Sequence, residues 1–348
     1  MNKEGNKKIE NGTDSVSRSM SMFADMLIEK IEHLSSGDKW EKPWFSNNSL
    51  GIPKNMNGRM YNGMNSLMLI MCCEKNGYTI PRFCTFDCVQ RMNKNEENKD
   101  LPRVSILKGE KSFPVLCTTF TCINKETKEK IPYDDYKNRS EDERNKYSIY
   151  PKFQTYRVFN VAQTNLKEAR PELWARLEAE YAPKEELKEH GYSFAPVDDM
   201  ITRQTWICPI KPTQGDEAYF SISKNEIVLP LKGQFKDGES FYTSLFHEMA
   251  HSTGHESQLG RIKPASFGSK DYAREELVAE LTAALNAQHY GMVKNLEEDS
   301  ACYLKAWLDS LKEEPQFIRS TLIDVKKAFA ILSQHIDCQL VSTDKDVE

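Results

Sequence analysis

The chain of 348 residues is longer than one ordinary domain and suits two domains of typical size. Hydrophobic residues make up 39% of it and charged residues 28%, which excludes a wholly disordered or collagen-like chain. The formal net charge of −5 hides an asymmetry, because residues 1–170 hold 28 Lys and Arg against 22 Asp and Glu, and residues 171–348 hold 19 against 30. This asymmetry indicates one part that meets a polyanion, although two domains with different surface compositions would explain it equally well.

The sequence shows no sign of a membrane protein or of an exported one. Its longest apolar run, residues 67–73, is far short of the roughly 20 residues that span a bilayer. The first 18 residues are polar with charges of both signs, unlike a signal peptide. The nine cysteines are odd in number and scattered, which favours reduced thiols over a disulfide framework. We therefore expect a cytoplasmic protein with no membrane partner.

The N-terminal half has the pattern of a small mixed α/β domain over residues 19–163, preceded by a disordered tail over residues 1–18. Apolar residues at helical spacing predict a helix over residues 20–34, and a second, buried helix is expected over residues 66–75 before Asn76-Gly77. The segment 40–61 is rich in Pro, Gly and Asn and predicts a loop with exposed aromatic residues. Strands are expected over 104–106, 115–122 and 156–161, with the mixed-charge run 125–146 as a solvated excursion.

The C-terminal half predicts a second domain over residues 196–340, joined to the first by a connector over residues 164–195. Two short apolar segments around Lys224-Asn225, residues 219–223 and 227–230, predict a β-hairpin that ends on proline. Helices are expected over residues 239–253, 272–290, 299–311 and 316–334. The fold class is therefore α+β, with two domains.

The strongest chemical signal is the sequence His247-Glu248-Met249-Ala250-His251 on the first of these helices. Histidines at positions i and i+4 lie one above the other on a helix face, so both imidazoles can bind one Zn²⁺ ion. The glutamate beside the first histidine is placed to take a proton from a metal-bound water. The pattern predicts a zinc-dependent metallopeptidase with Glu248 as general base.

A catalytic zinc normally has three protein ligands, so one more is needed. The position at which a metzincin has its third histidine is Ser257 here, and His255 lies past the glycine that ends the helix. Glu276 and Glu280, four residues apart on the next helix, share one face and are the better candidates. We expect Glu276 to bind the metal and Glu280, which does not bind it, to orient a histidine by accepting a hydrogen bond from its N–H. The reverse assignment stays open.

Two blocks of the sequence resemble ArdC-type antirestriction proteins. The C-terminal block resembles their zincin-like metallopeptidase domain in Leu229-Pro230, Phe235, Tyr242, Leu245, His247-Glu248, His251, Thr253-Gly254-His255, Leu259, Arg261, Tyr272-Ala273 and Glu275-Glu276-Leu277-Val278-Ala279-Glu280. The N-terminal block resembles their first domain in Trp40, Lys42-Pro43-Trp44, Pro53, Asn55, Gly58-Arg59, Tyr61, Gly63, Asn65, Leu67, Pro81-Arg82-Phe83, Thr85-Phe86, Lys108-Gly109-Glu110-Lys111 and Phe159-Asn160-Val161-Ala162-Gln163. The resemblance implies a single-stranded DNA-binding domain followed by a metallopeptidase domain with an HExxH helix. It also implies a role in conjugation, in which the protein shields incoming DNA from host restriction.

The N-terminal half also carries the side chains that single-stranded DNA binding requires. Single strands are held by cations that contact phosphates and by aromatic faces on which bases stack. Aromatic and basic residues alternate in the loops of this half, and we expect DNA contacts from Trp40, Lys42, Trp44, Arg59, Tyr61, Arg82, Phe83, Lys108 and Lys111. Tryptophans are more often core residues than stacking platforms, and Asn65 and Gln163 are equally well explained as buried amides.

Two functions of different classes are compatible with the sequence. In the first, the protein is a working peptidase, and its DNA-binding domain delivers it to an unidentified substrate among DNA-bound proteins. In the second, it is a DNA-shielding protein whose single zinc ion is structural. Glu248 favours the first, because a purely structural site has no need of a base beside its histidine.

Overall fold

The computed structural model describes residues 18–19, 21–32, 51–61, 63–94, 101–182, 193–263, 265–266, 269–294, 307 and 315–343. The expected tail before Arg18 and, apart from Trp307, the expected helix over 299–311 lie outside the described residues. The same holds for part of the expected loop, including Trp40, Lys42 and Trp44. Within the described ranges, no helix combines the length and the apolar character that crossing a bilayer requires.

A five-stranded sheet organises the N-terminal half, in the order β1-β2-β5-β3-β4. Its strands are β1 (Lys54–Asn55), β2 (Arg82–Thr85), β3 (Phe113–Asn124), β4 (Lys130–Ile131) and β5 (Tyr147–Asn160). β1 pairs with β2 in parallel, and the remaining pairs are antiparallel. The strand expected over 104–106 is wrong, since only an isolated bridge between Ile106 and Thr164 forms there. The Asn93 side chain bonds both backbone polar groups of Val104, which leaves that residue no ladder to join.

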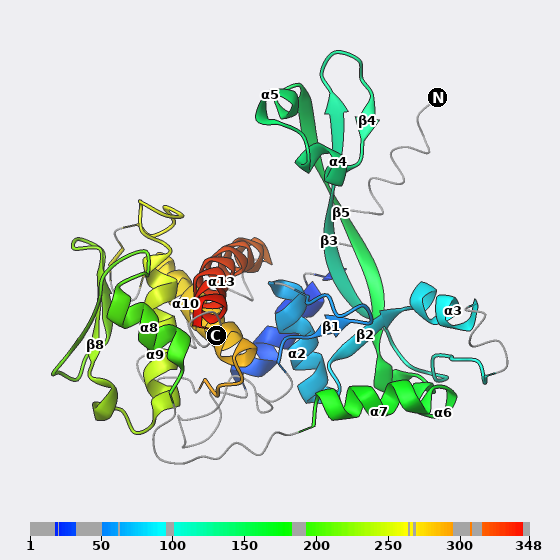
Figure 1. Cartoon of the computed structure of the whole chain (residues 1–348), viewed down its shortest axis with the longest axis horizontal. Coiled ribbons are helices and arrows are strands. Elements are labelled where there is room, and N and C mark those ends of the chain that lie inside the picture. The colour runs from blue at the N-terminus through cyan, green and yellow to red at the C-terminus, as the bar shows by residue number, and fades with distance from the viewer. Residues whose placement is uncertain are drawn as a thin grey trace.

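β3 and β5 form a long hairpin arm that projects from the body of the molecule (Figure 1). The register runs from Phe113 opposite Val158 to Asn124 opposite Tyr147, so both strands extend beyond their expected bounds. The tip of the arm carries β4 and two short helices, α4 (Tyr133–Lys137) and α5 (Glu141–Arg144). Residues 125–130 and 141–146 are exposed, which confirms that this mixed-charge run is solvated.

Helices pack on both faces of the sheet because successive strand residues point in opposite directions. Phe83 and Val158 face α2 (Met64–Asn76) and the first helix, residues 21–32. Cys84 and Phe159, the next residue of each strand, face a second core. That core includes side chains from α3 (Phe86–Lys94), α6 (Leu166–Ala169) and α7 (Pro171–Glu180). The first part of the expected connector thus packs against the N-terminal half.

The C-terminal half combines a small sheet with long helices. It contains α8 (Ala195–Arg203), β6 (Ile210–Thr213), β7 (Tyr219–Ser221), β8 (Glu226–Pro230), η4 (Lys232–Gln234), α9 (Gly238–Ser252), α10 (Lys270–His289) and α13 (Pro315–Thr343). The sheet order β6-β8-β7 confirms the predicted hairpin and makes β8 its central strand. α13 has 29 residues and continues well past the expected end at residue 334.

Helix α10 belongs to the cores of both halves. Leu277, Leu281 and Ala284 pack in one core with residues of α2 and of the first helix. Ala283 and Ala287 pack in another core, with side chains of α9 and of the small sheet. The helix that carries the candidate third metal ligand is therefore held between the N-terminal half and α9.

Candidate metal centre

Helix α9 presents the two histidines from a buried position. Its N-terminus is capped by Asp237, whose side chain accepts a hydrogen bond of 2.7 Å from the amide of Ser240. Apolar residues around the motif, including Leu245 and Met249, are fully buried and fix the orientation of the helix. His247 and His251 therefore project from one face, one turn apart, as the spacing predicted.

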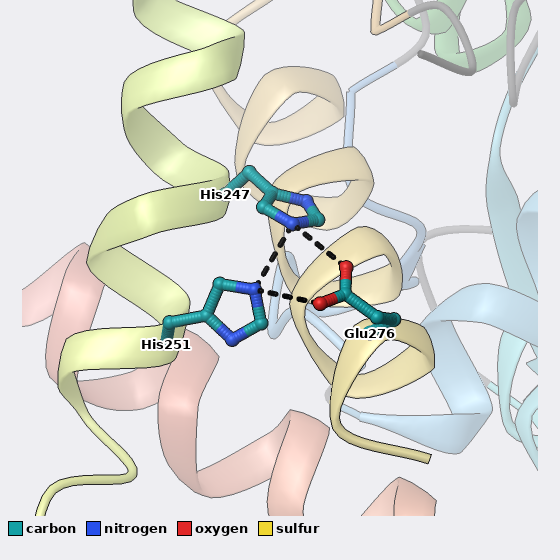
Figure 2. Close-up of side chains that lie close together, drawn as sticks. All are labelled: His247, His251 and Glu276. Atoms are coloured by element: carbon teal, nitrogen blue, oxygen red, sulfur yellow. Dashed lines mark hydrogen bonds and ion pairs between the residues drawn. The ribbon is translucent and has the colours of Figure 1, made fainter. Parts of the chain in front are cut away.

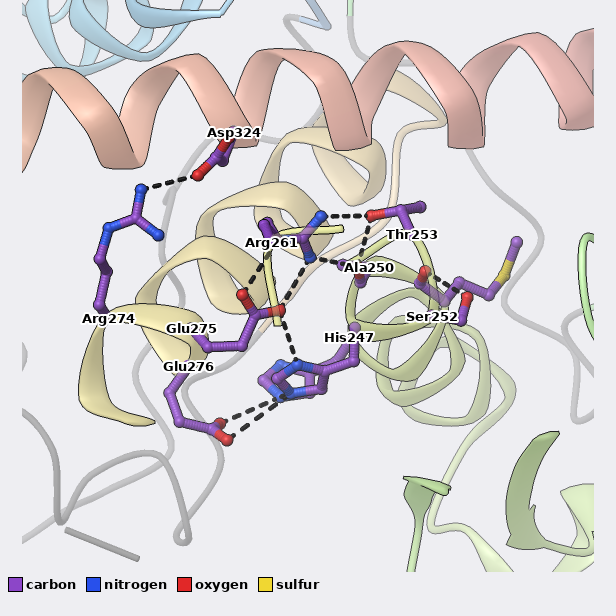
Figure 3. Close-up of polar contacts among 11 residues, drawn as sticks. His247, Ala250, Ser252, Thr253, Arg261, Arg274, Glu275, Glu276 and Asp324 are labelled. Atoms are coloured by element: carbon purple, nitrogen blue, oxygen red, sulfur yellow. Dashed lines mark hydrogen bonds and ion pairs between the residues drawn. The ribbon is translucent and has the colours of Figure 1, made fainter. Parts of the chain in front are cut away.

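Helix α10 lies beside α9 and contributes the carboxylates. Ser269 caps its N-terminus by accepting a hydrogen bond from the amide of Tyr272. Glu276 faces the two histidines (Figure 2), and Glu275 reaches the same region (Figure 3). Glu280, one turn further along α10, lies near His247.

Three side-chain atoms converge with the spacing of a metal site. Nε2 of His247 and Nε2 of His251 are 3.1 Å apart. The Glu276 carboxylate lies 3.4 Å from Nε2 of His247 and 3.6 Å from Nε2 of His251 (Figure 2). A tetrahedral zinc with bonds of about 2.0–2.1 Å separates neighbouring ligand atoms by about 3.3 Å. The three residues thus fit one metal ion, and within the described residues no other His, Cys, Asp and Glu form such a group.

The imidazole of His251 is oriented from behind by a carboxylate and a guanidinium. Its Nδ1 lies 3.2 Å from Oε1 of Glu275, which Arg261 holds through two hydrogen bonds of 2.8 and 2.9 Å. Arg261 also donates to the Ala250 carbonyl and to the Thr253 hydroxyl at the end of α9 (Figure 3). An imidazole with its other nitrogen bonded in this way has a fixed tautomer and a fixed ring orientation.

His247 has a similar but looser arrangement. Its Nδ1 lies 3.6 Å from Oε1 of Glu280, which also lies 3.7 Å from the ammonium of Lys294. The side chains of Glu280 and Lys294 are 0% and 1% exposed. This is the place that we expected for Glu280, but the partner roles of Glu275, Arg261 and Lys294 were not predicted.

The charges around the histidines suit a divalent cation. Four carboxylates (Glu248, Glu275, Glu276 and Glu280) face two cations, Arg261 and Lys294, so this group of side chains carries two excess negative charges when the imidazoles are neutral. A buried excess of this size is costly unless it is compensated. One divalent ion bound by His247, His251 and Glu276 would neutralise the group.

In the metal-free protein, the same charges raise the pKa of both imidazoles. Burial alone would lower the pKa of His247, but the hydrogen bond that the ring donates to Glu276 and the charges of Glu280 and Glu248 outweigh burial and raise the pKa to about 10. Burial alone would raise the pKa of Glu276, but the charges of both histidines and a hydrogen bond from Tyr272 lower it to about 2. A metal ion therefore has to displace the proton of His247 when it binds.

Glu248 is 7% exposed and lies close enough to act on both histidines, since its charge raises the pKa of each. His255 lies beyond the end of α9, where its Nδ1 is 2.8 Å from the Ser257 hydroxyl, and it is not part of the ligand group.

The predicted DNA contacts are placed in several different environments. Arg59, Lys108 and Lys111 are exposed, and Tyr61 is half-buried against the core. Phe83 is fully buried, so its prediction as a stacking surface is wrong: the residue lies in a strand that is covered on both faces. The guanidinium of Arg82 is committed inside the protein, to Glu180 at 2.8 Å and to the carbonyl of Asn55. Trp40, Lys42 and Trp44 lie outside the described residues.

Comparison with protein families assigns each half separately. A family model described as the N-terminal domain of anti-restriction factor ArdC matches residues 17–159. A second, described as a zincin-like metallopeptidase, matches residues 199–321. The C-terminal half is thus a zincin-like metallopeptidase domain. With an ArdC N-terminal domain before it, the chain is an ArdC-type protein.

Individual relatives match nearly the whole chain. Two DNA primases TraC of Escherichia coli are 26% and 27% identical over 94% and 88% of this chain, and the chain spans under a third of the length of each. The crystal structure of ArdC from the R388 plasmid, in its metal-free form, has a TM-score of 0.65 at 22% identity and covers 91% of this chain and 97% of that one. Its Mn(II)-bound form has a TM-score of 0.63. These structures establish the fold.

Proposed function

We propose that the protein binds single-stranded DNA through its N-terminal half and hydrolyses peptide bonds at a zinc centre formed by His247, His251 and Glu276. In this proposal it acts in the cytoplasm during conjugation, where it protects incoming DNA and cleaves proteins associated with that DNA. The observation that carries the enzymatic part is the convergence of three ligand atoms, 3.1 to 3.6 Å apart, beside Glu248. The ArdC N-terminal domain and the basic half of the chain support the DNA-binding part.

Zinc is our choice of metal because two imidazoles and one carboxylate, with a fourth position for water, form the ligand set of many zinc peptidases. The same nitrogen and oxygen donors also bind other divalent ions, and the ArdC of R388 has been crystallised with Mn(II). When bound, a divalent ion supplies Lewis-acid polarisation of a peptide carbonyl and lowers the pKa of water.

The remaining chemistry falls to side chains of this protein. Glu248 is proposed to accept a proton from the attacking water and to return it to the leaving amine. Its burial and its place next to His247 keep it at the centre without making it a ligand. Glu275 and Glu280 hold the two imidazoles in place, so that the site needs little rearrangement during the reaction.

The small sheet is proposed to align the substrate. β8 is paired on both sides, so a peptide cannot add to it. The outer edge of β7 is the better candidate, because the ring of Phe220 on this strand packs against His255 just after α9. An extended peptide added at this edge would run past the end of the helix that carries both histidines.

The alternative function is a DNA-shielding protein whose zinc site is structural. The limited access to the centre favours it, since the side chains of His247, His251 and Glu276 are 7%, 13% and 12% exposed. The two functions differ in the role of Glu248, which is a general base in the peptidase and has no role beyond local packing in the shielding protein.

Cleavage of fluorescein-labelled casein by wild type and by Glu248→Gln, with and without an oligothymidylate, separates them. If Glu248 is the general base, the variant loses about 10²- to 10⁴-fold in rate while it still binds one metal ion per chain. Glu256→Gln, an exposed change just after α9, is the matched control and should cleave like wild type. Equal rates for wild type and Glu248→Gln would leave only the shielding function.

A further inference from the structure

A cavity of about 820 Å³ lies in the N-terminal half, between the first helix, the end of α2, the turn before β3 and the end of β5. Cations and aromatic rings line it together: Lys75, Tyr78, Lys111, Phe113, Arg157 and Phe159. Ligand sites of small molecules typically have volumes of about 300–1,000 Å³, so the cavity is large enough for a nucleotide.

Two separate segments that resemble the ArdC family meet at this cavity, residues 108–111 and residues 159–163. Gln163, from the second segment, donates hydrogen bonds to the Glu110 carboxylate at 2.8 Å and to the Lys111 carbonyl at 2.9 Å. Its own side-chain oxygen accepts from the amide of Asn160, and its backbone carbonyl accepts from Leu107. The turn over residues 108–111 is thus fixed on both sides, and Lys111 is held at the wall of the cavity.

The cations of the cavity differ in their partners. Lys75 forms an ion pair with Glu29 at 2.7 Å. Glu110, an acidic residue of the lining, accepts a hydrogen bond from Gln163. Lys111 and Arg157 are exposed and form no ion pair within the described part of the chain. Two exposed cations at one cavity attract an anion such as a phosphate.

The aromatic rings of the cavity are held rigidly. Tyr78, Phe113 and Phe159 are half-buried: the first two pack against the core shared with α2, and the third against the core on the other face of the sheet. Phe113 rests edge-to-face on the buried ring of Phe83, with 6.4 Å between ring centroids. Rings supported in this way lose little conformational entropy when a flat ligand stacks on them.

We propose that this cavity takes one nucleotide of a single-stranded DNA, with its base against Tyr78 and Phe113 and its phosphates at Lys111 and Arg157. The assignment rests on the proposed single-stranded DNA binding and gives it a location. A single strand is the expected ligand because a base within a duplex is stacked and paired and would first have to be extruded.

Fluorescence anisotropy with a labelled oligothymidylate tests the two cations. Arg157→Ala and Lys111→Ala should each weaken binding about 5- to 10-fold at about 0.1 M salt and make the slope of log affinity against log salt shallower by about 0.7. Arg203→Ala, an exposed change on α8 in the other half of the molecule, is the matched control and should behave like wild type. Arg157→Lys and Lys111→Arg should keep most of the affinity.

Tyr78→Leu tests the aromatic part, and it should weaken binding about tenfold with no change in the salt slope. Its melting temperature shows whether the variant is folded, and Phe113→Leu replaces it if it is not. Thymidine monophosphate and a matched duplex should both compete poorly with the labelled strand. Equal competition by the mononucleotide would overturn the assignment to a strand, and equal competition by the duplex would overturn the insertion of a base.

The outcomes for the cavity and for the proposed function are distinguishable. If wild type does not bind the oligothymidylate, the single-stranded DNA-binding function itself is overturned. If wild type binds and the variants at Lys111, Arg157 and Tyr78 all behave like Arg203→Ala, DNA binding stands and the cavity is not its site.

Discussion

The charged side chains of the proposed metal centre are buried, whereas those of the proposed nucleotide cavity are exposed. At the centre, the carboxylates of Glu248, Glu275, Glu276 and Glu280 are 0–15% exposed and outnumber the two buried cations by two. At the cavity, Lys111 and Arg157 are exposed to water and have no partner ion in the described residues. Ligand affinity at a buried site depends on geometry and on protonation, whereas ligand affinity at an exposed charged site depends on the salt concentration. The two proposed ligands should therefore respond to different solution variables.

The two regions are nevertheless joined through one helix. α10 carries Glu276 on the side that faces α9, and it buries Leu277 and Leu281 in the core that it shares with α2. Helix α2 also lines the cavity through Lys75, and Tyr78 follows two residues after the end of this helix. Both sites are therefore supported by the packing of α10 against α2. The following predictions, from the largest expected effect to the smallest, test how far the two sites are separate.

Glu276→Ala should have the largest effect on metal binding. It removes one of three ligand side chains, so the loss of zinc affinity should exceed the roughly 10- to 100-fold that changes to the outer partners produce. Competition with a chromogenic chelator measures it, with Glu256→Gln as control. A variant that retains wild-type affinity would mean that Glu280 or another group is the third ligand.

Arg261→Met should lower zinc affinity about 10- to 100-fold, because Glu275 would no longer hold His251 in place. It should also lower the free energy of unfolding by about 3–5 kcal/mol, since a buried carboxylate loses its partner. Arg274→Met breaks the ion pair with Asp324 on the other side of the helix and serves as the control. If both variants bind zinc equally well, Arg261 has no role in positioning the histidine.

Salt should separate the two regions most clearly. Raising the salt concentration about fourfold should weaken binding of a single strand by about 10- to 100-fold, because several phosphate contacts release counterions. Zinc affinity of the buried centre should change about twofold or less under the same conditions. A similar response of both ligands would show that the centre is not shielded from solvent.

The pH dependence of zinc binding should be steep. The raised pKa keeps His247 protonated at neutral pH in the metal-free protein, and binding requires the neutral imidazole. Apparent affinity should therefore rise with pH, about tenfold per pH unit for each displaced proton, until the pH passes about 10. Calorimetry in buffers of different ionisation enthalpy measures the released protons, and binding without proton release would contradict the charge balance described above.

Asn65→Ala should have the smallest effect and should leave both ligands unaffected. The Asn65 side chain joins α2 to β3 through two hydrogen bonds with the backbone of Leu116, at 2.7 and 2.9 Å. Their loss should lower the free energy of unfolding by about 1–3 kcal/mol. Denaturant unfolding measures this, and a matching loss of DNA affinity would instead make Asn65 part of the interface.

The sequence predicted the metal centre better than the DNA surface because the spacing of residues on a helix has a fixed geometric meaning. Two histidines four residues apart must share a face, and so must Glu276 and Glu280. Which carboxylate faces which histidine depends on how α9 and α10 pack together, and this explains why the role of Glu275 was missed. Lys294 lies beyond the end of α10, and no local pattern connects it to Glu280.

Phe83 shows why aromatic residues next to loops are harder to assign. A ring followed by apolar neighbours fits a stacking platform and a core strand equally well, and only the layers on both sides of β2 decide between them. The run from Ile80 to Cys84 has the continuous apolar character of a strand buried on both faces, apart from Arg82, which Glu180 neutralises. Phe113 and Arg157 had no such local signal, because the cavity joins segments far apart in the sequence.

Anomalous X-ray diffraction from crystals grown with Zn²⁺ tests the central claim most directly. We predict one strong peak per chain, about 2.0–2.2 Å from Nε2 of His247, from Nε2 of His251 and from a carboxylate oxygen of Glu276. A peak elsewhere, or one bound by the two histidines with Glu276 outside coordinating distance, would contradict the account.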